Sequence, residues 1–223
     1  MTKGSLSVIS GFSGAGKGTV VRELMKLGGN YSLSVSMTTR QPRNGEVEGK
    51  DYFFVSTEQF EEKITNGGLL EYAAFVDHYY GTPKEFVKKQ IEEGKDVILE
   101  IESQGGAQIK RIFSEAILVF ITAPNAEELS KRLMSRGTET PEAVYGRLRK
   151  AEQESHIINN YDYIIVNENH KQAECAAEIN TIIQSAKHAP YRNKPLIEGL
   201  QKGFDELIKE YVRTSGGKSE NKS

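Results

Sequence analysis

The feature that most constrains this chain is the segment SVISGFSGAGKGTV, residues 7–20. A strand-like run of apolar residues leads directly into a cluster of glycines with one lysine, and branched aliphatic residues then resume. Glycine costs roughly 0.5–1 kcal/mol inside a regular element, so a cluster of glycines marks a backbone path that side chains would block. The segment therefore predicts a strand, a tight loop and a helix, in that order.

This loop predicts a phosphate site. Gly11 to Lys17 lie between a predicted strand and a predicted helix, which is the context of a P-loop. The backbone N–H groups of residues 13–18 can converge on phosphate oxygens only if side chains stay clear, and the helix N-terminus adds a favourable dipole. Lys17 supplies a mobile positive charge for the β and γ phosphates. The alternative interpretation is an ordinary glycine turn between strand and helix.

The residue after the lysine determines whether the loop itself can bind Mg²⁺. A P-loop usually has Ser or Thr there, and its hydroxyl binds Mg²⁺, but this chain has Gly18 before Thr19. Mg²⁺ commonly keeps several waters and binds through phosphates. We therefore expect no direct protein ligand for Mg²⁺ in this loop, and water-mediated contacts instead.

Length and composition favour one soluble α/β domain with inserted subdomains, since the chain has 223 residues. The net charge of −2 provides no overall attraction for nucleic acid or an anionic membrane. Cys175 is the single cysteine, which excludes an internal disulfide and fits a reducing compartment. No run approaches the ~20 apolar residues of a membrane span. We therefore expect a cytoplasmic protein with no nucleic acid or membrane partner.

Strand patterns alternate with helix patterns, which predicts a mostly parallel sheet with helices on both faces. The predicted strands are 5–10, 31–36, 51–55, 96–101, 116–122 and 161–166, with a strand-rich stretch ending near residue 82. The predicted helices are 17–27, 57–66, 83–93, 104–112, 125–135, 141–158, 170–187 and 194–211. Because VISG, DVILEI, AILVFI and YDYIIV are nearly continuously apolar, these four strands are expected to be buried on both faces.

Local signals place several helix ends. Ser56 with Gln59 predicts a capping box, and Thr82-Pro83 and Thr140-Pro141 each predict an N-cap followed by proline at the first helical position. Gly94 predicts a helix stop. In the last predicted helix the apolar residues recur at helical spacing, so this helix is expected to pack on the protein's own core or, alternatively, on another molecule.

Arginines gather in two short segments. Arg40 and Arg43 lie in TTRQPRNGE, a further four lie between residues 132 and 149, and residues 44–110 contain none. The planar guanidinium matches phosphate oxygens in pairs and stays charged, so this clustering favours phosphate binding. Arg136 and Arg147 are well placed for a mobile flap. A solvated helix face is an equally good interpretation of Arg132 and Arg149.

One carboxylate stands out in the run LLEYAAFVDHYYGTP. Glu71 lies among apolar residues, where an unpaired carboxylate would be costly. Guanine offers two adjacent donors, N1–H and the exocyclic amine, whereas adenine presents an acceptor at N1. A carboxylate accepts only, so Glu71 would select guanine and penalise the wrong base.

With these residues considered, the chain resembles the guanylate kinases over roughly residues 5–187. The matching segments are GFSGAGKGT, SMTTRQPRNGEVEGKDYFFV, LLEYAAF, YYGTP, VILEIESQGGAQI, RLMSRGTET, RLRKAEQE and YDYIIVNEN. The resemblance implies an α/β P-loop kinase core with a parallel sheet flanked by helices, an inserted GMP-binding region and a small lid. The implied parts are a core of residues 1–33, 85–125 and 151–190, a GMP-binding region of 34–84 and a lid of 126–150. Beyond the resemblance, helical spacing and composition predict an accessory helix of 191–213 and a disordered tail of 214–223.

The resemblance also implies the site residues. ATP would bind to Gly11, Ser13, Gly14, Ala15, Gly16, Lys17, Gly18, Thr19 and, near adenine, Asn167. GMP would bind to Ser36, Arg40, Arg43, Tyr52, Glu71, Tyr80, Thr82 and Glu102. Catalysis would depend on Lys17, Arg40, Arg136 and Arg147. This chain reads Leu99-Glu100-Ile101-Glu102 where the family usually has LEID, so the charge at position 102 is kept with one more methylene.

The implied reaction is Mg²⁺-dependent, in-line transfer of the γ-phosphoryl group of ATP to GMP, and to dGMP as well, in purine nucleotide metabolism. The metal would be held by ATP phosphates and waters, with Glu100 either touching it through water or solvated. Two alternatives stay open: a phosphopeptide-binding scaffold module, and an enzyme that accepts AMP or UMP. The chain would act as a monomer or a homodimer.

Overall fold

In the computed structural model, residues 3–75, 77–135 and 140–216 are described. The chain divides into two compact units, residues 1–183 and residues 184–223. All predicted nucleotide-binding residues belong to the first unit, except that Arg136 lies outside the described residues. Each unit is considered by itself below.

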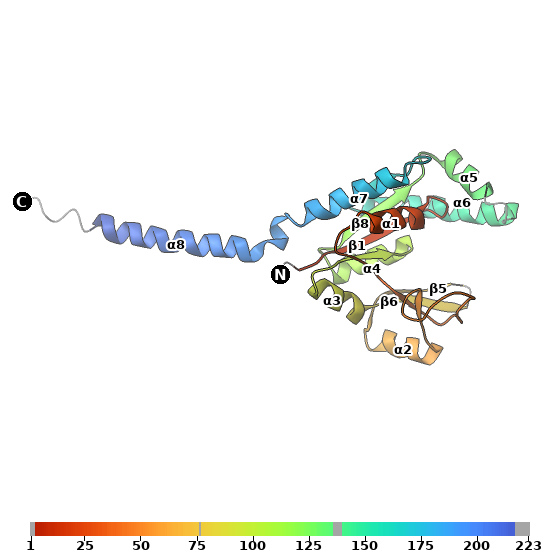
Figure 1. Ribbon diagram of the computed structural model, residues 1–223, viewed down its shortest axis with the longest axis horizontal. Coiled ribbons are helices and arrows are strands. Elements are labelled where there is room, and N and C mark those ends of the chain that lie inside the picture. The colour runs from red at the N-terminus through yellow and green to blue at the C-terminus, as the bar shows by residue number, and fades with distance from the viewer. Residues whose placement is uncertain (1–2, 76, 136–139, 217–223) are drawn as a thin grey trace, which may run out of the picture. The chain divides into compact units, whose positions relative to one another are not determined.

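A five-stranded parallel sheet forms the centre of the first unit (Figure 1). Its strands, in spatial order, are β2 (Tyr31–Leu33), β7 (Asp96–Glu100), β1 (Leu6–Gly11), β8 (Ile117–Thr122) and β9 (Tyr163–Val166). Since all five run the same way, the loops that follow them meet at one edge of the sheet. The predicted parallel α/β core is confirmed.

Helices cover both faces of this sheet. On one face α3 (Lys84–Glu92) and α4 (Ser103–Ile112) pack against β1 and β7 through a fully apolar cluster. Alternate strand residues point to the other face, where α1 (Lys17–Lys26) and α7 (Gln172–Ala186) lie (Figure 1). Within these two helices Val20, Leu24 and Ile179 are completely buried.

The strand β9 departs from the prediction. Of its four residues only Ile165 is buried, and Ile164 is 53% exposed. This strand pairs with β8 alone and forms the edge of the sheet, so it lacks the neighbour that would cover it. The expected burial of YDYIIV on both faces is therefore wrong, whereas β1 and β8 and all but the last residue of β7 are buried or nearly so.

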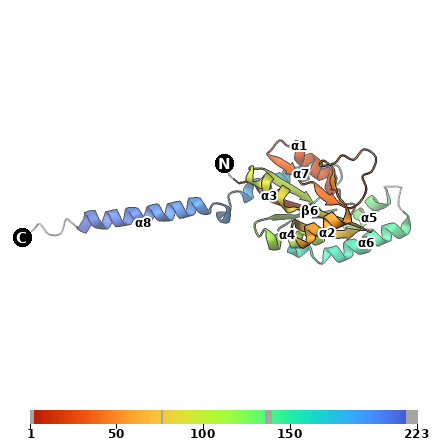
Figure 2. The same ribbon diagram turned by 90° about the horizontal axis from the view of Figure 1, so that it is seen from below.

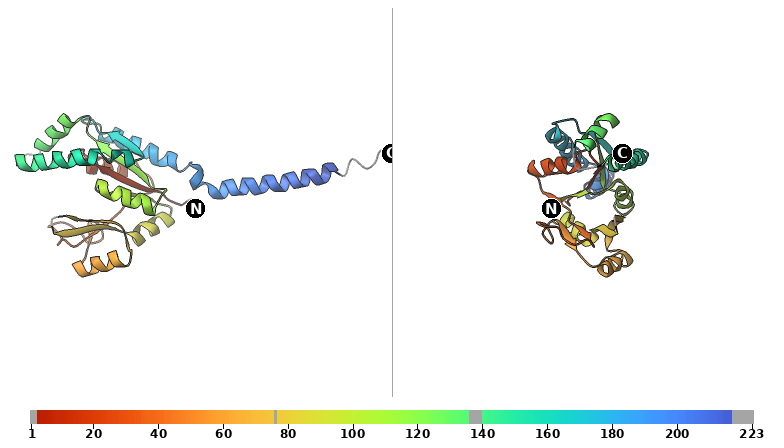
Figure 3. Two further views of the ribbon diagram at one scale, coloured as in Figure 1. Left: turned by 180° about the vertical axis from the view of Figure 1, so that it is seen from behind. Right: turned by 90° about the vertical axis from the view of Figure 1, so that its right-hand side faces the viewer.

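A second, mixed sheet of four strands lies on the α4 side of the parallel sheet (Figure 3). Its spatial order is β4 (Tyr52–Phe54), β3 (Ser36–Thr38), β6 (His78–Pro83) and β5 (Leu69–Phe75). The helix α2 (Thr57–Thr65) packs on it through Phe60, which is completely buried against Met37 and Leu69. The predicted strand 31–36 is in fact two strands in different sheets, because the chain leaves the core sheet after β2.

The helices α5 (Ala126–Met134) and α6 (Pro141–Ser155) lie side by side at one end of the first unit (Figure 2). Leu129 and Leu133 of α5 pack with Val144 and Ala151 of α6 in a small apolar cluster that Phe12 also touches. The predicted helix 141–158 ends at Ser155 and is followed by a short 3₁₀ turn, η1 (Ile158–Asn160).

Most of the predicted helix ends are confirmed. Ser56 and Gln59 form the capping box, Thr140 caps α6, and Gly94 follows α3 with a φ of 81°. Thr82 is the exception, because Pro83 is the N-cap of α3 and receives no side-chain hydrogen bond. The Thr82 hydroxyl is committed elsewhere, to Glu71.

The second unit contains η2 (Pro190–Arg192) and the long helix α8 (Lys194–Gly216). The apolar stripe of α8 is confirmed, but its side chains are exposed, so the expected burial is not found within this unit. The exposed residues are Leu196, Leu200, Phe204, Leu207, Ile208, Tyr211 and Val212. Residues 214–216 of the expected disordered tail are helical, and residues 217–223 lie outside the described part of the chain. In the described ranges no helix is long and apolar enough to cross a membrane.

Candidate active site

The glycines of the P-loop are required by its backbone geometry. Gly14 and Gly16 have φ values of 90° and 88°, in the left-handed region that other residues avoid. A Cβ on Gly16 would lie 2.5 Å from Asn167 Nδ2, and one on Gly11 would lie 2.2 Å from the Ile121 carbonyl oxygen. The loop is therefore pressed against β8 and the residue after β9, and side chains are excluded from it.

Two side chains hold the loop in place. Asn167, which is 1% exposed, donates a hydrogen bond from Nδ2 to the Ala15 carbonyl oxygen at 2.7 Å. The Lys17 ammonium donates to the Gly11 carbonyl oxygen at 3.1 Å, and the Thr19 hydroxyl accepts from Arg22 at 3.0 Å. The buried amide of Asn167 thus supports the loop from the core, and its predicted contact with adenine stays a prediction.

Two carboxylates lie at the end of β7, Glu100 as its last residue and Glu102 two residues later. Glu100 Oε1 lies 3.3 Å from where a Cβ on Gly18 would be. Although Glu100 as a residue is exposed, partial desolvation of its carboxylate raises its pKa, and the charges of Lys17 and Arg22 oppose this rise. Desolvation also tends to raise the pKa of Glu102. The hydrogen bond to Lys150 and the charge of Lys17 outweigh this effect, so the pKa of Glu102 is lowered.

The helix α6 reaches from the P-loop to the start of α4. Arg147 donates to the Ser13 hydroxyl in the P-loop, and Lys150 donates to Glu102, the N-cap residue of α4. Residues three apart lie on the same face of a helix, so one face of α6 contacts both. The two contacts bring Ser13, Arg147 and Glu102 into one region, and the charge of Lys17 acts on Glu102 there. That these residues bind nucleotides stays a prediction.

The small sheet gathers the predicted phosphate-binding residues. Tyr80 pairs with Thr38, after which the β3–β4 loop begins, and Tyr52 pairs with Ser36 at the point where that loop ends. The Tyr52 and Tyr80 ring centroids are 6.1 Å apart, and the Arg40 guanidinium lies 5.4 Å from the Tyr52 ring. Hydrogen bonding to Glu46 raises the pKa of Arg40, and burial raises the pKa of Tyr52. Arg43, also in this loop, is exposed.

Glu71 forms the other end of this region. Its side chain is buried, with 8% of the residue exposed, and Oε1 accepts a hydrogen bond from the Thr82 hydroxyl at 2.6 Å. A shift of strand register between Leu69 and Tyr72 accompanies this placement. Burial raises the pKa of Glu71, and the Thr82 hydrogen bond only partly opposes the rise. Oε2 lies 3.2 Å from where a Cβ on Gly105 would be, so the carboxylate sits against the first turn of α4.

Three side chains around this site have partners that sequence reasoning did not identify. Glu46 binds Arg40, Lys150 binds Glu102, and Arg132 donates to Glu128, to the Asn167 carbonyl oxygen and to Asn169. Arg132 thereby ties α5 to the loop after β9, so it is not a solvated residue. The available signals were an acid three residues after Arg43 for Glu46, and a position one turn after Arg147 for Lys150.

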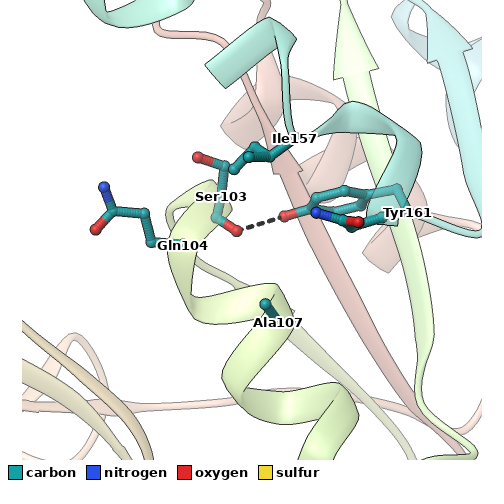
Figure 4. Close-up of a pocket in the computed structure, with 6 residues that line it drawn as sticks. Ser103, Gln104, Ala107, Ile157 and Tyr161 are labelled. Atoms are coloured by element: carbon teal, nitrogen blue, oxygen red, sulfur yellow. Dashed lines mark hydrogen bonds between the residues drawn. The ribbon is translucent and has the colours of Figure 1, made fainter. Parts of the chain in front are cut away.

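A separate pocket of about 290 Å³ lies between α4 and η1 (Figure 4). The Tyr161 hydroxyl donates to the Ser103 carbonyl oxygen across it at 3.0 Å. Burial raises the pKa of Tyr161 to about 12. The lining contains none of the predicted nucleotide-binding residues; it consists of Ser103, Gln104, Ala107, Ile157, Asn160 and Tyr161.

A P-loop at the edge of a parallel sheet, a second sheet with arginines and tyrosines, and a helical pair that reaches over the loop together define a nucleoside monophosphate kinase. The family model described as guanylate kinase matches residues 3–186. The chain therefore belongs to the guanylate kinase family, and it phosphorylates GMP to GDP.

Relatives of known function and a solved structure agree with this assignment. A guanylate kinase of Clostridioides difficile is 48% identical over 205 residues, which is 92% of this chain and 98% of the relative. A guanylate kinase of Lactococcus lactis is 45% identical over 94% of this chain and 95% of its own. The crystal structure of guanylate kinase from Anaplasma phagocytophilum matches with a TM-score of 0.67 and 31% identity, covering 86% of this chain and 90% of that one.

Proposed function

We propose that the P-loop binds ATP, that the small sheet binds GMP, and that α6 closes over both so that the γ-phosphoryl group passes directly between them. The observation that carries this proposal is the reach of α6, with Arg147 on Ser13 of the P-loop and Lys150 on Glu102 at the start of α4. In this division residues 1–33, 85–125 and 151–190 are the core, 34–84 bind GMP and 126–150 form the lid.

On the ATP side, the main-chain N–H groups of the loop cradle the phosphates. Lys17 turns from the Gly11 carbonyl oxygen toward the β and γ phosphates, while Arg147 meets the transferred group from the lid with Arg136. Since the transition state spreads charge over the phosphoryl oxygens, these cations act mainly by positioning and electrostatic stabilisation. Asn167 keeps the loop in the binding conformation, and its contact with adenine would require its buried side chain to become accessible when ATP binds.

The residues near the loop fit Mg²⁺ carried by ATP. In the described part of the chain no three His, Cys, Asp or Glu residues are grouped to hold a metal. Glu100 is a partly desolvated carboxylate beside Gly18, and desolvation raises its pKa more than the charges of Lys17 and Arg22 lower it. A hydrated ion held by the phosphates would add positive charge there, and Glu100 would accept from its waters. When bound, Mg²⁺ neutralises the phosphate charge during transfer.

On the GMP side, Arg40, Arg43, Tyr52 and Tyr80 hold the phosphate, and Ser36, Glu71, Thr82 and Glu102 surround the base and ribose. Thr82 donates to one oxygen of Glu71, so it fixes the carboxylate while leaving lone pairs for guanine N1–H and the exocyclic amine. The burial of Glu71 makes an unmatched base costly. This favours GMP over AMP or UMP.

The transfer needs no strong general base. The phosphate of GMP has a second pKa of roughly 6, so it is ionised and nucleophilic near pH 7. Closure of α6 over both nucleotides would exclude water and prevent hydrolysis of ATP. We further propose that the protein works in the cytoplasm, as a monomer or homodimer, on nucleotides alone.

The experiment is a coupled assay of ADP formation with GMP, dGMP, AMP and UMP, with and without Mg²⁺. We expect rapid turnover with GMP, lower but measurable turnover with dGMP, and little with AMP or UMP. Binding of GMP without turnover would support the scaffold alternative. Equal turnover with AMP would contradict the role of Glu71.

A further inference from the structure

The carboxylate of Glu46 joins both arginines of the β3–β4 loop, residues 39–51. Its Oε1 accepts from Arg40 Nη2 at 2.8 Å. Its Oε2 accepts from Arg40 Nη1 at 3.0 Å and from the backbone N–H of Arg43 at 2.7 Å. One side chain therefore fixes the guanidinium of Arg40 and the main chain at Arg43 at the same time.

Further contacts hold the Arg40 guanidinium in place. Nη1 also donates to the Gln41 carbonyl oxygen at 2.7 Å, and the guanidinium lies near the rings of Tyr52 and Phe54, at 5.4 and 5.9 Å. The side chains of Arg40 and Glu46 are 12% and 21% exposed. Aromatic rings thus bound the guanidinium, and Glu46 holds the Nη edge. A phosphate would approach the part that these contacts leave open.

Charge and geometry make opposite predictions for Glu46. Its negative charge lies against the cations that would bind a phosphate dianion, so on Coulomb attraction alone its removal should tighten GMP binding. If the carboxylate instead aims Arg40, its removal should weaken binding, because bidentate recognition of phosphate depends on the direction of the guanidinium fork. The sign of the change therefore separates the two roles.

We propose that Glu46 is a positioning residue for the phosphate of GMP, acting through Arg40 and the main chain of Arg43. This inference rests on the proposed assignment of Arg40 and Arg43 to that phosphate. The loop between β3 and β4 has no regular structure, and the bidentate contact with charge-assisted hydrogen bonds fixes it in one conformation. A preformed pair of arginines loses less conformational freedom when the phosphate binds.

The test is steady-state kinetics of the full chain with Glu46→Gln. We expect the KM for GMP to rise about 10- to 100-fold, as for misplacement of a positioning group, while the KM for ATP changes less than twofold. Competitive inhibition by guanosine, which has no phosphate, should also change less than twofold. Glu48→Gln is the matched control, because Glu48 lies in the same loop and accepts from the Phe54 backbone N–H at 2.9 Å. It should leave the KM for GMP within twofold.

Coupling to Arg40 gives an independent readout. In an Arg40→Lys background there is no fork to aim, so Glu46→Gln should raise the KM for GMP less than threefold. If Glu46→Gln does not fold, Glu46→Asp replaces it, because aspartate keeps the charge but cannot reach both arginines.

Three results would overturn the inference: a lower or unchanged KM for GMP, a loss of guanosine affinity equal to that of GMP, or a full effect in the Arg40→Lys background. Wild-type protein that makes no GDP would instead contradict the proposed function, whatever Glu46 does.

Discussion

Replacement of Glu71 by glutamine should separate substrate recognition from stability. Glu71 is 8% exposed, and its carboxylate accepts a hydrogen bond from the Thr82 hydroxyl at 2.6 Å. Glutamine has nearly the same shape but offers one acceptor and one donor. Against guanine that donor would face another donor. Since hydrogen bonds to charged groups contribute about 1.5–3 kcal/mol, we expect a loss of about 2–4 kcal/mol, or roughly 30- to 700-fold in kcat/KM for GMP.

In the absence of GMP, the same substitution should leave the stability of the fold unchanged or raise it. Burial raises the pKa of Glu71 above its ordinary value of 4.5. A carboxyl group with a raised pKa in the folded state stabilises the fold below its unfolded pKa, and this contribution is lost as pH rises through the folded pKa. Near pH 7.5 Glu71→Gln should therefore melt at or above the wild-type temperature, and the difference should vanish below about pH 4.5.

Thermal melting with and without GMP measures both effects. At a GMP concentration of 100 times the wild-type Kd, the wild type gains about 2.7 kcal/mol of stability, whereas a variant with 100-fold weaker binding gains about 0.4 kcal/mol. Asp96→Asn is the control, because Asp96 is a buried carboxylate that accepts from the Ser5 backbone N–H and hydroxyl at the start of β7, the opposite end of that strand from Glu100. It should lose about 1–3 kcal/mol of stability and keep its GMP response. The reasoning is refuted if Glu71→Gln melts lower but retains its response to GMP, or if its KM for ATP rises as much as that for GMP.

Three further predictions concern the loop and the second unit. Lys17→Met should lower turnover by at least about 10³-fold in the coupled assay, with a melting temperature close to the wild type, because Lys17 makes one hydrogen bond within the loop; near-normal turnover would contradict its role. Gly16→Ala should cost about 1–3 kcal/mol of stability, because its φ is 88° and a Cβ would meet Asn167 Nδ2 at 2.5 Å. Its ATP-induced thermal shift should vanish, and normal ATP binding would count against this loop geometry. Deletion of residues 194–223 should leave kcat and both KM values within twofold; loss of activity by a deletion protein that still melts cooperatively would show that α8 takes part in the reaction.

The features that could be predicted from sequence are those that local chemistry determines. The glycines of the P-loop mark backbone that cannot carry side chains, and Gly14 and Gly16 have the positive φ values that explain them. Glu71 stood out because it lies in an apolar run, where burial of an unpaired carboxylate is costly. In the structure it is buried. The alternation of strands and helices also predicted the parallel core, because the spacing of apolar residues in each segment shows which of its faces are buried.

The wrong predictions concern residues whose burial or hydrogen-bond partner depends on parts of the chain that are distant in sequence. β9 has the composition of a central strand, but its place at the edge follows from the order of all five strands. Thr82 has the sequence of an N-cap, yet Glu71, eleven residues earlier, takes its hydroxyl. The pairs Lys150–Glu102 and Asn167–Ala15 join residues 48 and 152 positions apart. No local pattern contains such partners, because tertiary packing alone brings them together.

Four carboxylates of the proposed site divide into two groups by their partners. Glu46 and Glu102 are paired with Arg40 and Lys150, and their pKa values are lowered. Glu71 and Glu100 are desolvated, and their pKa values are raised. The carboxylate of Glu46 is satisfied by its pairing and is proposed to orient Arg40, whereas Glu102 keeps its negative charge beside Lys150 for its proposed contact with GMP. A desolvated carboxylate whose charge is not fully compensated gains most from a ligand that brings donors or positive charge, which is what guanine would offer at Glu71 and hydrated Mg²⁺ would offer at Glu100. Under the proposed function, the two nucleotides would thus relieve the electrostatic cost that the free protein carries at these two positions.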